Sequence, residues 1–170
     1  MISYSEFEKN IQMVFRKLIN AYQLTFNTVW EGHYTLSNNN CLLKFIYDLG
    51  EVTCGIKHPD EPNGNPGFGT LAVYRFLFPE EEIDLGELNS PQIQLAKNYL
   101  VLNGKLRGVF EGNFYWEKDY VNWSLEVKKM TKFMWENMDI NNPIYEKFSK
   151  GDGSWISDLK EYLRENNLSL

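Results

Sequence analysis

The sequence predicts an α+β fold: an N-terminal helix packed on an antiparallel β-meander of four to five strands, followed by a helical C-terminal half. Apolar and polar residues alternate from residue 24 to residue 57, as one buried and one solvated sheet face require. Turn signals at residues 31–33, 38–40 and 48–50 cut this run into strands. Outside the run, apolar residues recur every three or four positions, which is the period of an amphipathic helix.

The first helix is expected over residues 5–22. Ser3 and Ser5 are competing N-caps, because each is followed three residues later by a glutamate at capping-box spacing. The apolar stripe of this helix needs a partner surface, and the sheet that follows is the nearest candidate.

Four strands are expected over residues 24–30, 34–37, 42–47 and 51–57. A hairpin closed at Leu49-Gly50 pairs residues whose numbers sum to about 99. Cys41 and Cys54 are offset in that register, so we expect two buried, free thiols rather than a disulfide.

Residues 58–69 contain three prolines and three glycines, a composition that predicts irregular structure. The apolar run at residues 70–78 is compatible with either a strand or a short helix. Residues 80–87 are expected to form an acidic loop.

The remaining chain is predicted to be helical. Ser90-Pro91 is an N-cap followed by proline at the first helical position. Residues 100–106 are compatible with a helix end at Asn103-Gly104 or with a hairpin, and we favour the helix end. A long helix is expected over about residues 120–138, and Ser154 is expected to cap the last one. No repeat or change of composition divides residues 1–170, so a single α+β domain is predicted.

Charge and hydropathy of the chain argue against two classes of function, nucleic-acid binding and membrane insertion. The net charge is -6 at pH 7 and no dense basic cluster is present, which argues against nucleic-acid binding. No apolar segment approaches the length of a membrane span, and the first residues lack the pattern of a signal peptide. A cytoplasmic protein that binds no membrane is therefore expected.

Catalytic and metal-binding patterns are not found in the sequence. The two histidines, His33 and His58, lie in predicted loops, and no nucleophile-elbow motif accompanies them. His58, Asp60 and Glu61 match no common metal-ligand spacing. We therefore expect no catalytic residue, no metal and no cofactor.

The predicted partner-binding surface is acidic. The carboxylates of residues 80–87 would attract a basic protein domain, since opposite charges steer association. Phe114, Tyr115 and Trp116 are consecutive, so they cannot all face inward from one regular element, and an exposed aromatic ring is a candidate binding anchor. The surface residues we predict are Glu80, Glu81, Glu82, Asp84, Glu87 and Trp116.

The first 60 or so residues resemble small immunity proteins of bacterial polymorphic toxin systems and the families grouped with them. The resemblance rests on the helix-then-meander order and on the segments 34–38, 45–48 and 51–53. It implies a cytoplasmic, non-catalytic protein that blocks a cognate toxin, often a basic nuclease, by covering it.

The leading hypothesis is thus a binding protein, in its sharpest form an immunity protein that inhibits a toxin by direct contact. One alternative is an enzyme or small-ligand protein with a pocket between sheet and helices, lined by aromatics such as Tyr47, Tyr74 and Trp123. Another is a structural or regulatory protein that forms homo-oligomers through a sheet edge or a helix face.

Overall fold

The computed structural model describes residues 2–60, 67–81, 90–150 and 152–170. Contacts divide the chain into two compact units, residues 1–115 and residues 116–170. Each unit is described by itself, and the single domain expected over residues 1–170 stays a prediction. Within the described ranges, no helix combines the length and the apolar character needed to cross a bilayer.

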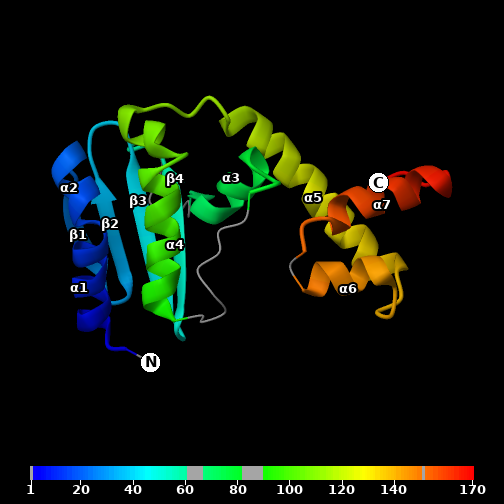
Figure 1. Ribbon diagram of the computed structural model, residues 1–170, viewed down its shortest axis with the longest axis horizontal. Coiled ribbons are helices and arrows are strands. Elements are labelled where there is room, and N and C mark those ends of the chain that lie inside the picture. Colours follow the sequence, from blue (N-terminus) through cyan, green and yellow to red (C-terminus); the bar gives the residue numbers. More distant parts are fainter. Residues whose placement is uncertain (1, 61–66, 82–89, 151) are drawn as a thin grey trace. The chain divides into compact units, whose positions relative to one another are not determined.

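The first unit is built on a five-stranded antiparallel sheet in the order β1-β2-β3-β4-β5 (Figure 1). The strands are β1 (Thr25–Trp30), β2 (His33–Ser37), β3 (Leu42–Asp48), β4 (Glu51–Lys57) and β5 (Phe68–Gly69). Leu42 pairs with Lys57 and Phe45 with Cys54, so the predicted register of the β3–β4 hairpin is confirmed. The predicted α+β class and the meander are confirmed as well.

Two strand details differ from the expectations. Phe68 and Gly69 form a short strand on β4, inside the segment predicted to be irregular, because the backbone there finds an unpaired sheet edge. His33, expected in a turn, instead begins β2.

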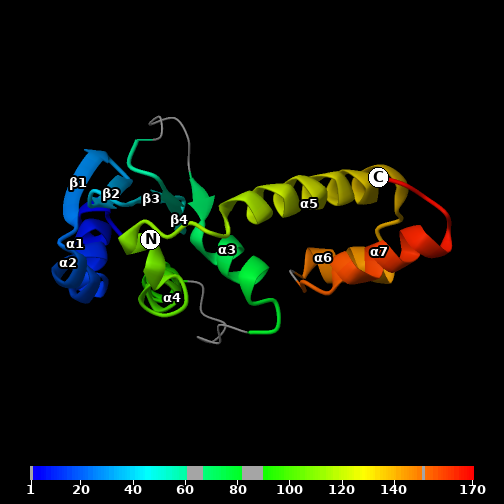
Figure 2. The ribbon, with the colours of Figure 1, turned by 90° about the horizontal axis from the view of Figure 1, so that it is seen from above.

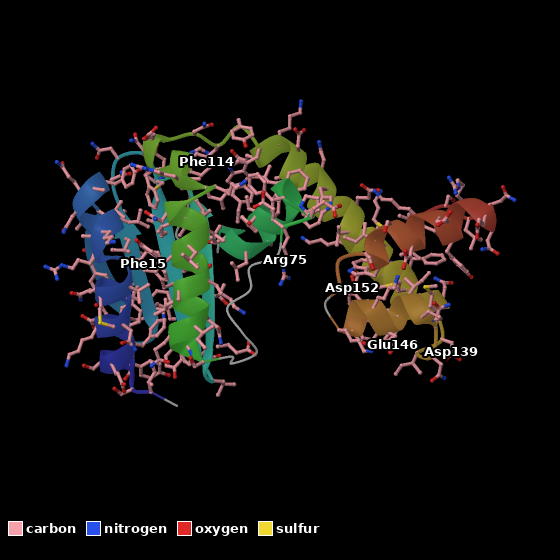
Figure 3. The ribbon with its side chains drawn as sticks, in the orientation of Figure 1. Phe15, Arg75, Phe114, Asp139, Glu146 and Asp152 are labelled. Carbon is pink, nitrogen blue, oxygen red and sulfur yellow. The ribbon has the colours of Figure 1, made fainter. Side chains whose placement is uncertain are left out.

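The N-terminal helix is interrupted once. Helix α1 (Tyr4–Val14) and helix α2 (Arg16–Tyr22) meet at Phe15, where φ is -90° and ψ is 4°. Of the two competing caps, Ser3 is the one used, since its side chain accepts a hydrogen bond of 3.1 Å from the Glu6 amide. Phe15, labelled in Figure 3, lies between the helices and the sheet. Its ring is edge-on to that of Phe45, with 5.0 Å between the ring centroids.

The core of the first unit lies between one sheet face and its helices. Helices α1, α2 and α4 (Pro91–Asn103) all cover the same side of the sheet (Figure 2). Alternate residues of β2 and β3 are therefore buried, as the two-residue period predicts, whereas β1 has no buried residue and β4 is buried continuously from Cys54 to Lys57. The buried strand residues on this side are Tyr34, Leu36, Leu43, Phe45, Tyr47, Cys54 and Ile56.

Both segments that the sequence left ambiguous are helical. Helix α3 (Thr70–Leu77) follows β5 directly, and the Thr70 hydroxyl donates a 3.1 Å hydrogen bond to the Cys54 carbonyl. Helix α4 ends at Asn103 with Gly104 at the C-cap, so the helix end we favoured is confirmed. A short 3₁₀ helix, η1 (Arg107–Glu111), follows and was not anticipated.

The second unit consists of helices α5 (Glu117–Asn137), α6 (Pro143–Ser149) and α7 (Trp155–Glu165). Ser154 occupies the predicted cap position of α7, but its side chain makes no cap hydrogen bond. The Asp152 carboxylate instead accepts a 2.9 Å bond from the Ser154 amide. The fully packed core of this unit comprises Met130, Met134, Trp155, Leu159 and Leu163.

Candidate functional site

The predicted acidic surface lies partly outside the described residues, which include Glu80 and Glu81 but not Glu82, Asp84 or Glu87. The Glu81 carboxylate accepts hydrogen bonds from the Lys105 ammonium at 2.8 Å and the Tyr74 hydroxyl at 2.9 Å. These two bonds, that from Lys105 first, lower the pKa of Glu81. One of the five predicted acids is therefore partly neutralised by its own chain, and a partner-binding role for this segment stays a prediction.

The three consecutive aromatics divide as their adjacency requires. Trp116 is only 2% exposed and Phe114 is buried, whereas Tyr115 is 72% exposed. Of the three rings it is thus Tyr115 that is exposed, whereas the predicted anchor Trp116 is buried, and a partner-binding role for Trp116 stays a prediction.

Two of the residues predicted to line the aromatic pocket of the small-ligand alternative, Tyr47 and Tyr74, are buried against other rings, and the alternative itself stays a prediction. The Tyr47 ring stacks on Phe7, with centroids 4.5 Å apart, and Tyr74 is buried against Phe78. His58 lies against the Phe114 ring, 4.0 Å between centroids. Among the described side chains, no three of His, Cys, Asp or Glu come close enough together to hold a metal ion.

Both cysteines are free and buried, as predicted. Burial raises the pKa of Cys41 and of Cys54 to about 12. Each thiol is therefore neutral at physiological pH, and neither has the low-pKa, accessible setting of a nucleophile.

A different surface emerges at one end of the sheet, where the β1–β2 and β3–β4 turns lie next to each other. The two turns are neighbours because β2 pairs with β3 and the Tyr47 amide donates a 2.8 Å hydrogen bond to the Gly32 carbonyl. We name this region the turn surface and define it by Tyr4, Trp30, Glu31, Asp48, Leu49 and Glu51.

Leu49 is the most exposed large apolar side chain of the described residues, at 82%. It is also held in the left-handed region, with φ 48°, and Gly50 follows with φ 90°. Positive φ at both central residues is the pattern of a type I′ hairpin, which favours Asn-Gly or Asp-Gly. A leucine there costs roughly 1–2 kcal/mol of backbone strain. Because its side chain is exposed, almost no hydrophobic stabilisation offsets this cost.

A second unfavourable contact flanks the same turn. Asp48 and Glu51 face each other in the register of the hairpin, and like charges directly opposite destabilise a strand pair. A hairpin that combines a strained, exposed leucine with facing carboxylates is not optimised for folding. Local costs of this kind concentrate at positions kept for function.

Aromatic rings accompany Leu49 at this end of the sheet. Trp30 is 56% exposed, and its ring lies on His33 with 4.3 Å between centroids. The Tyr4 ring covers the neighbouring turn at Gly32, where φ is 80° and an added Cβ would come within 3.1 Å of that ring. Glycine is thus favoured at this turn, first by the positive φ and by the 2.9 Å approach of an added Cβ to the Tyr47 carbonyl oxygen.

The charge of the turn surface is negative. Glu31, Asp48 and Glu51 are exposed, and no described cation forms an ion pair with any of them. The pKa of His33 is lowered, first by burial and second by the charge of Lys44, while Asp48 opposes the shift. His33 is therefore neutral at pH 7 and leaves the acidic character of the surface intact.

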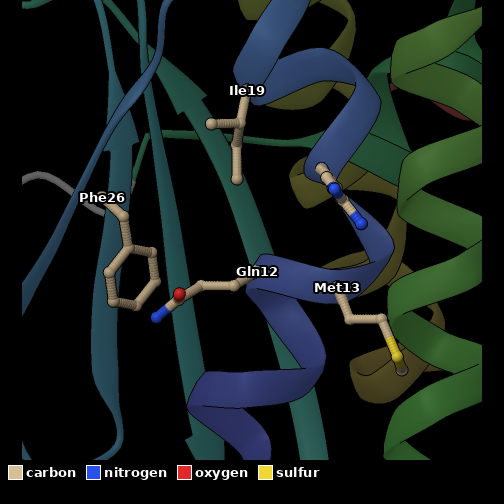
Figure 4. A pocket seen from close by; sticks show the side chains of 5 residues that line it. Gln12, Met13, Ile19 and Phe26 are labelled. Atoms are coloured by element: carbon tan, nitrogen blue, oxygen red, sulfur yellow. The ribbon is translucent and has the colours of Figure 1, made fainter.

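An open groove of about 450 Å³ lies elsewhere in the first unit, lined by Gln12, Met13, Arg16, Ile19 and Phe26 (Figure 4). The Gln12 side chain is directed toward the Phe26 ring of β1, while Met13 points the other way. The groove therefore follows the flank of α1 and α2 beside the outermost strand.

The sequence identified the Asp48-Leu49-Gly50 turn but not the exposure of Leu49 in it. An apolar residue at a turn position that normally takes asparagine or aspartate was the signal available. Comparisons with protein-family models, with curated proteins and with solved structures found no match to this chain.

Proposed function

We propose that this chain is a non-catalytic, cytoplasmic binding protein that inhibits a cognate bacterial toxin by covering it, with the turn surface at the centre of the contact. The observation that carries the proposal is Leu49, an apolar side chain presented to solvent at a cost in backbone strain.

The composition of the turn surface matches a basic protein partner. Trp30 and Tyr4 offer large, rigid contact area beside Leu49, and aromatic residues dominate binding hot spots. The surrounding carboxylates would steer a basic domain toward this end of the sheet and raise its association rate.

The proposed cytoplasmic location is supported by the cysteines. Cys41 and Cys54 are both free and both buried. Unpaired thiols are the usual state in reducing compartments, where disulfides are rare.

The test uses the basic domains encoded beside this gene in its own genome. Each domain would be purified, its binding to the full chain measured by calorimetry, and its toxicity scored with and without co-expression of the chain. A binding toxin whose association slows as salt rises is the expected result.

Variants then locate the contact. Leu49→Asn suits the left-handed turn, so the fold is kept while the apolar anchor is lost, and we expect affinity to fall by at least about thirtyfold. Leu100→Gln is the matched control, since Leu100 is an exposed leucine on α4 away from the turns. Equal affinity for the wild type and the Leu49→Asn variant would remove the turn surface from the proposal. Failure of every neighbouring basic domain to bind would overturn the toxin-inhibitor function.

A further inference from the structure

Among the described residues the outer edge of β1 has no paired strand, and its protection is limited to the bulge near its end. Among the described residues β1 pairs only with β2, and its regular part runs from Thr25 to Thr28, before a bulge near Trp30. Natural edge strands are commonly blocked by lysine, proline or inward-pointing charge. Residues 25–28 are Thr, Phe, Asn and Thr, so none of these devices is present.

The helix flank beside this edge carries an acidic, an amide and a basic side chain, in that order along the chain. Glu8 and Gln12 are four residues apart on one face of α1, and Arg16 begins α2 after the break at Phe15. Gln12 and Arg16 line the groove beside Phe26. Glu8 acts electrostatically on Tyr34, the residue that pairs with Thr28, and so lies toward the turn end of β1.

We propose that a second copy of this chain covers the edge, forming a two-fold symmetric dimer in which the two β1 strands pair antiparallel. A two-fold axis reverses the order of Glu8, Gln12 and Arg16 in the second copy, so the acidic end of one copy lies opposite the basic end of the other. With the axis near Gln12 and Phe26, Glu8 of each copy meets Arg16 of the other, and the two Gln12 amides face each other. No described residue forms an ion pair with Glu8 or with Arg16, so both charges are available to pair with a second copy of the chain.

The register of the pairing follows from the two faces of the sheet. Phe26 points to the helix side, as its partner Leu36 does. In the β1–β1 pair, the helix-facing sides of the two sheets join into one face only if Phe26 pairs with an even-numbered residue of the other copy. A slip by one residue would turn every side chain of one strand to the opposite face. Pairing Phe26 with its own counterpart satisfies this rule and brings the two grooves together, with Ile19 and Phe26 of both copies buried at the axis. Such an interface is isologous and closes after two subunits.

The test is the oligomeric state of the full chain. Sedimentation equilibrium from micromolar to millimolar concentration should fit a monomer–dimer equilibrium. Hydrogen exchange should show protection of β1 amides that increases with protein concentration. A chain that stays monomeric at millimolar concentration, or a dimer whose β1 amides exchange as fast as in the monomer, would overturn the proposal.

Charge variants identify the contact independently of folding. Glu8→Arg and Arg16→Glu should each weaken self-association by about tenfold or more, because each converts two symmetry-related attractions into repulsions. An equimolar mixture of these two variants should form a heterodimer, and the double variant with both substitutions should recover dimer affinity to within about threefold. Lys129→Glu, an equal charge change on exposed α5, is the control and should have no effect.

The outcomes separate this inference from the proposed function. Leu49→Asn should leave dimerisation unchanged, while Arg16→Glu should leave the Leu49 contact with a toxin unchanged. If β1 amides are protected only when a toxin domain is added to a monomeric chain, the edge serves the partner and the dimer is refuted.

Discussion

Replacing Leu49 by asparagine is expected to stabilise this protein, although the substitution removes a leucine. The leucine holds φ at 48° and is 82% exposed. Left-handed backbone costs roughly 1–2 kcal/mol for an ordinary L-residue and much less for asparagine, whose side chain hydrogen-bonds locally. Because so little of the side chain is buried, the loss of apolar contact is small compared with this relief.

We therefore expect the Leu49→Asn variant to gain roughly 1 kcal/mol in the free energy of unfolding. In urea this corresponds to a rise of about 0.5 M in the transition midpoint, with an unchanged slope. Tryptophan fluorescence and circular dichroism provide two probes of the same transition.

Leu49→Ala is the control for this reasoning. Alanine removes the apolar tip but keeps the left-handed strain, so its stability should stay within about 0.5 kcal/mol of the wild type. A lower midpoint for the asparagine variant would show that the leucine side chain makes a stabilising contact. The turn would then be a structural feature of the fold and not a cost retained for binding.

Three further predictions concern other parts of the first unit. The Cys41 and Cys54 thiols, with pKa raised to about 12, should react with a thiol reagent at pH 8 only as fast as the chain opens, and rapidly in urea. The pKa of the Glu81 carboxyl is lowered in the folded chain, so its contribution to stability is present above its ordinary pKa and is lost as pH falls through the folded value. An NMR titration that follows the Glu81 carboxyl carbon should show this pKa rising toward its ordinary value in Lys105→Met. Gly32→Ala should lower the free energy of unfolding by about 1–3 kcal/mol, since the added Cβ combines positive φ with a 2.9 Å approach to a backbone carbonyl. An unchanged urea midpoint would mean that the turn can shift.

The stability and binding predictions for Leu49 form one argument. Evolved proteins keep destabilising residues where function requires them, so a substitution that stabilises the fold and weakens binding marks a functional position. The same variant that raises the urea midpoint should therefore lose affinity for the partner. A raised midpoint with unchanged affinity would leave the strain at Leu49 without a binding role, and a loss of affinity with an unchanged midpoint would mean that the leucine binds the partner without straining the turn.

The local pattern of residues was sufficient to determine most of the secondary structure. Alternation of apolar and polar residues defined the strands, and the two-residue turn at Leu49-Gly50 set the register that pairs Leu42 with Lys57. Capping chemistry located the start of α4 and narrowed the start of α1 to two serines, because a serine hydroxyl satisfies helix amides only a few residues away. These features depend on neighbours in the sequence, which is why they could be read from it.

Only the tertiary structure decided which side chains the chain exposes together. Pairing of β2 with β3 brings the two turns to one end of the sheet and places Leu49 in the same acidic region as Trp30. Tertiary contacts also bury Trp116 and leave Tyr115 exposed, and they tie Glu81 to Lys105. Exposure and charge pairing depend on residues distant in sequence, and no local pattern encodes them. The acidic surface predicted at residues 80–87 is a different one from the surface at the hairpin ends, whose turns the sequence had located without revealing what they expose.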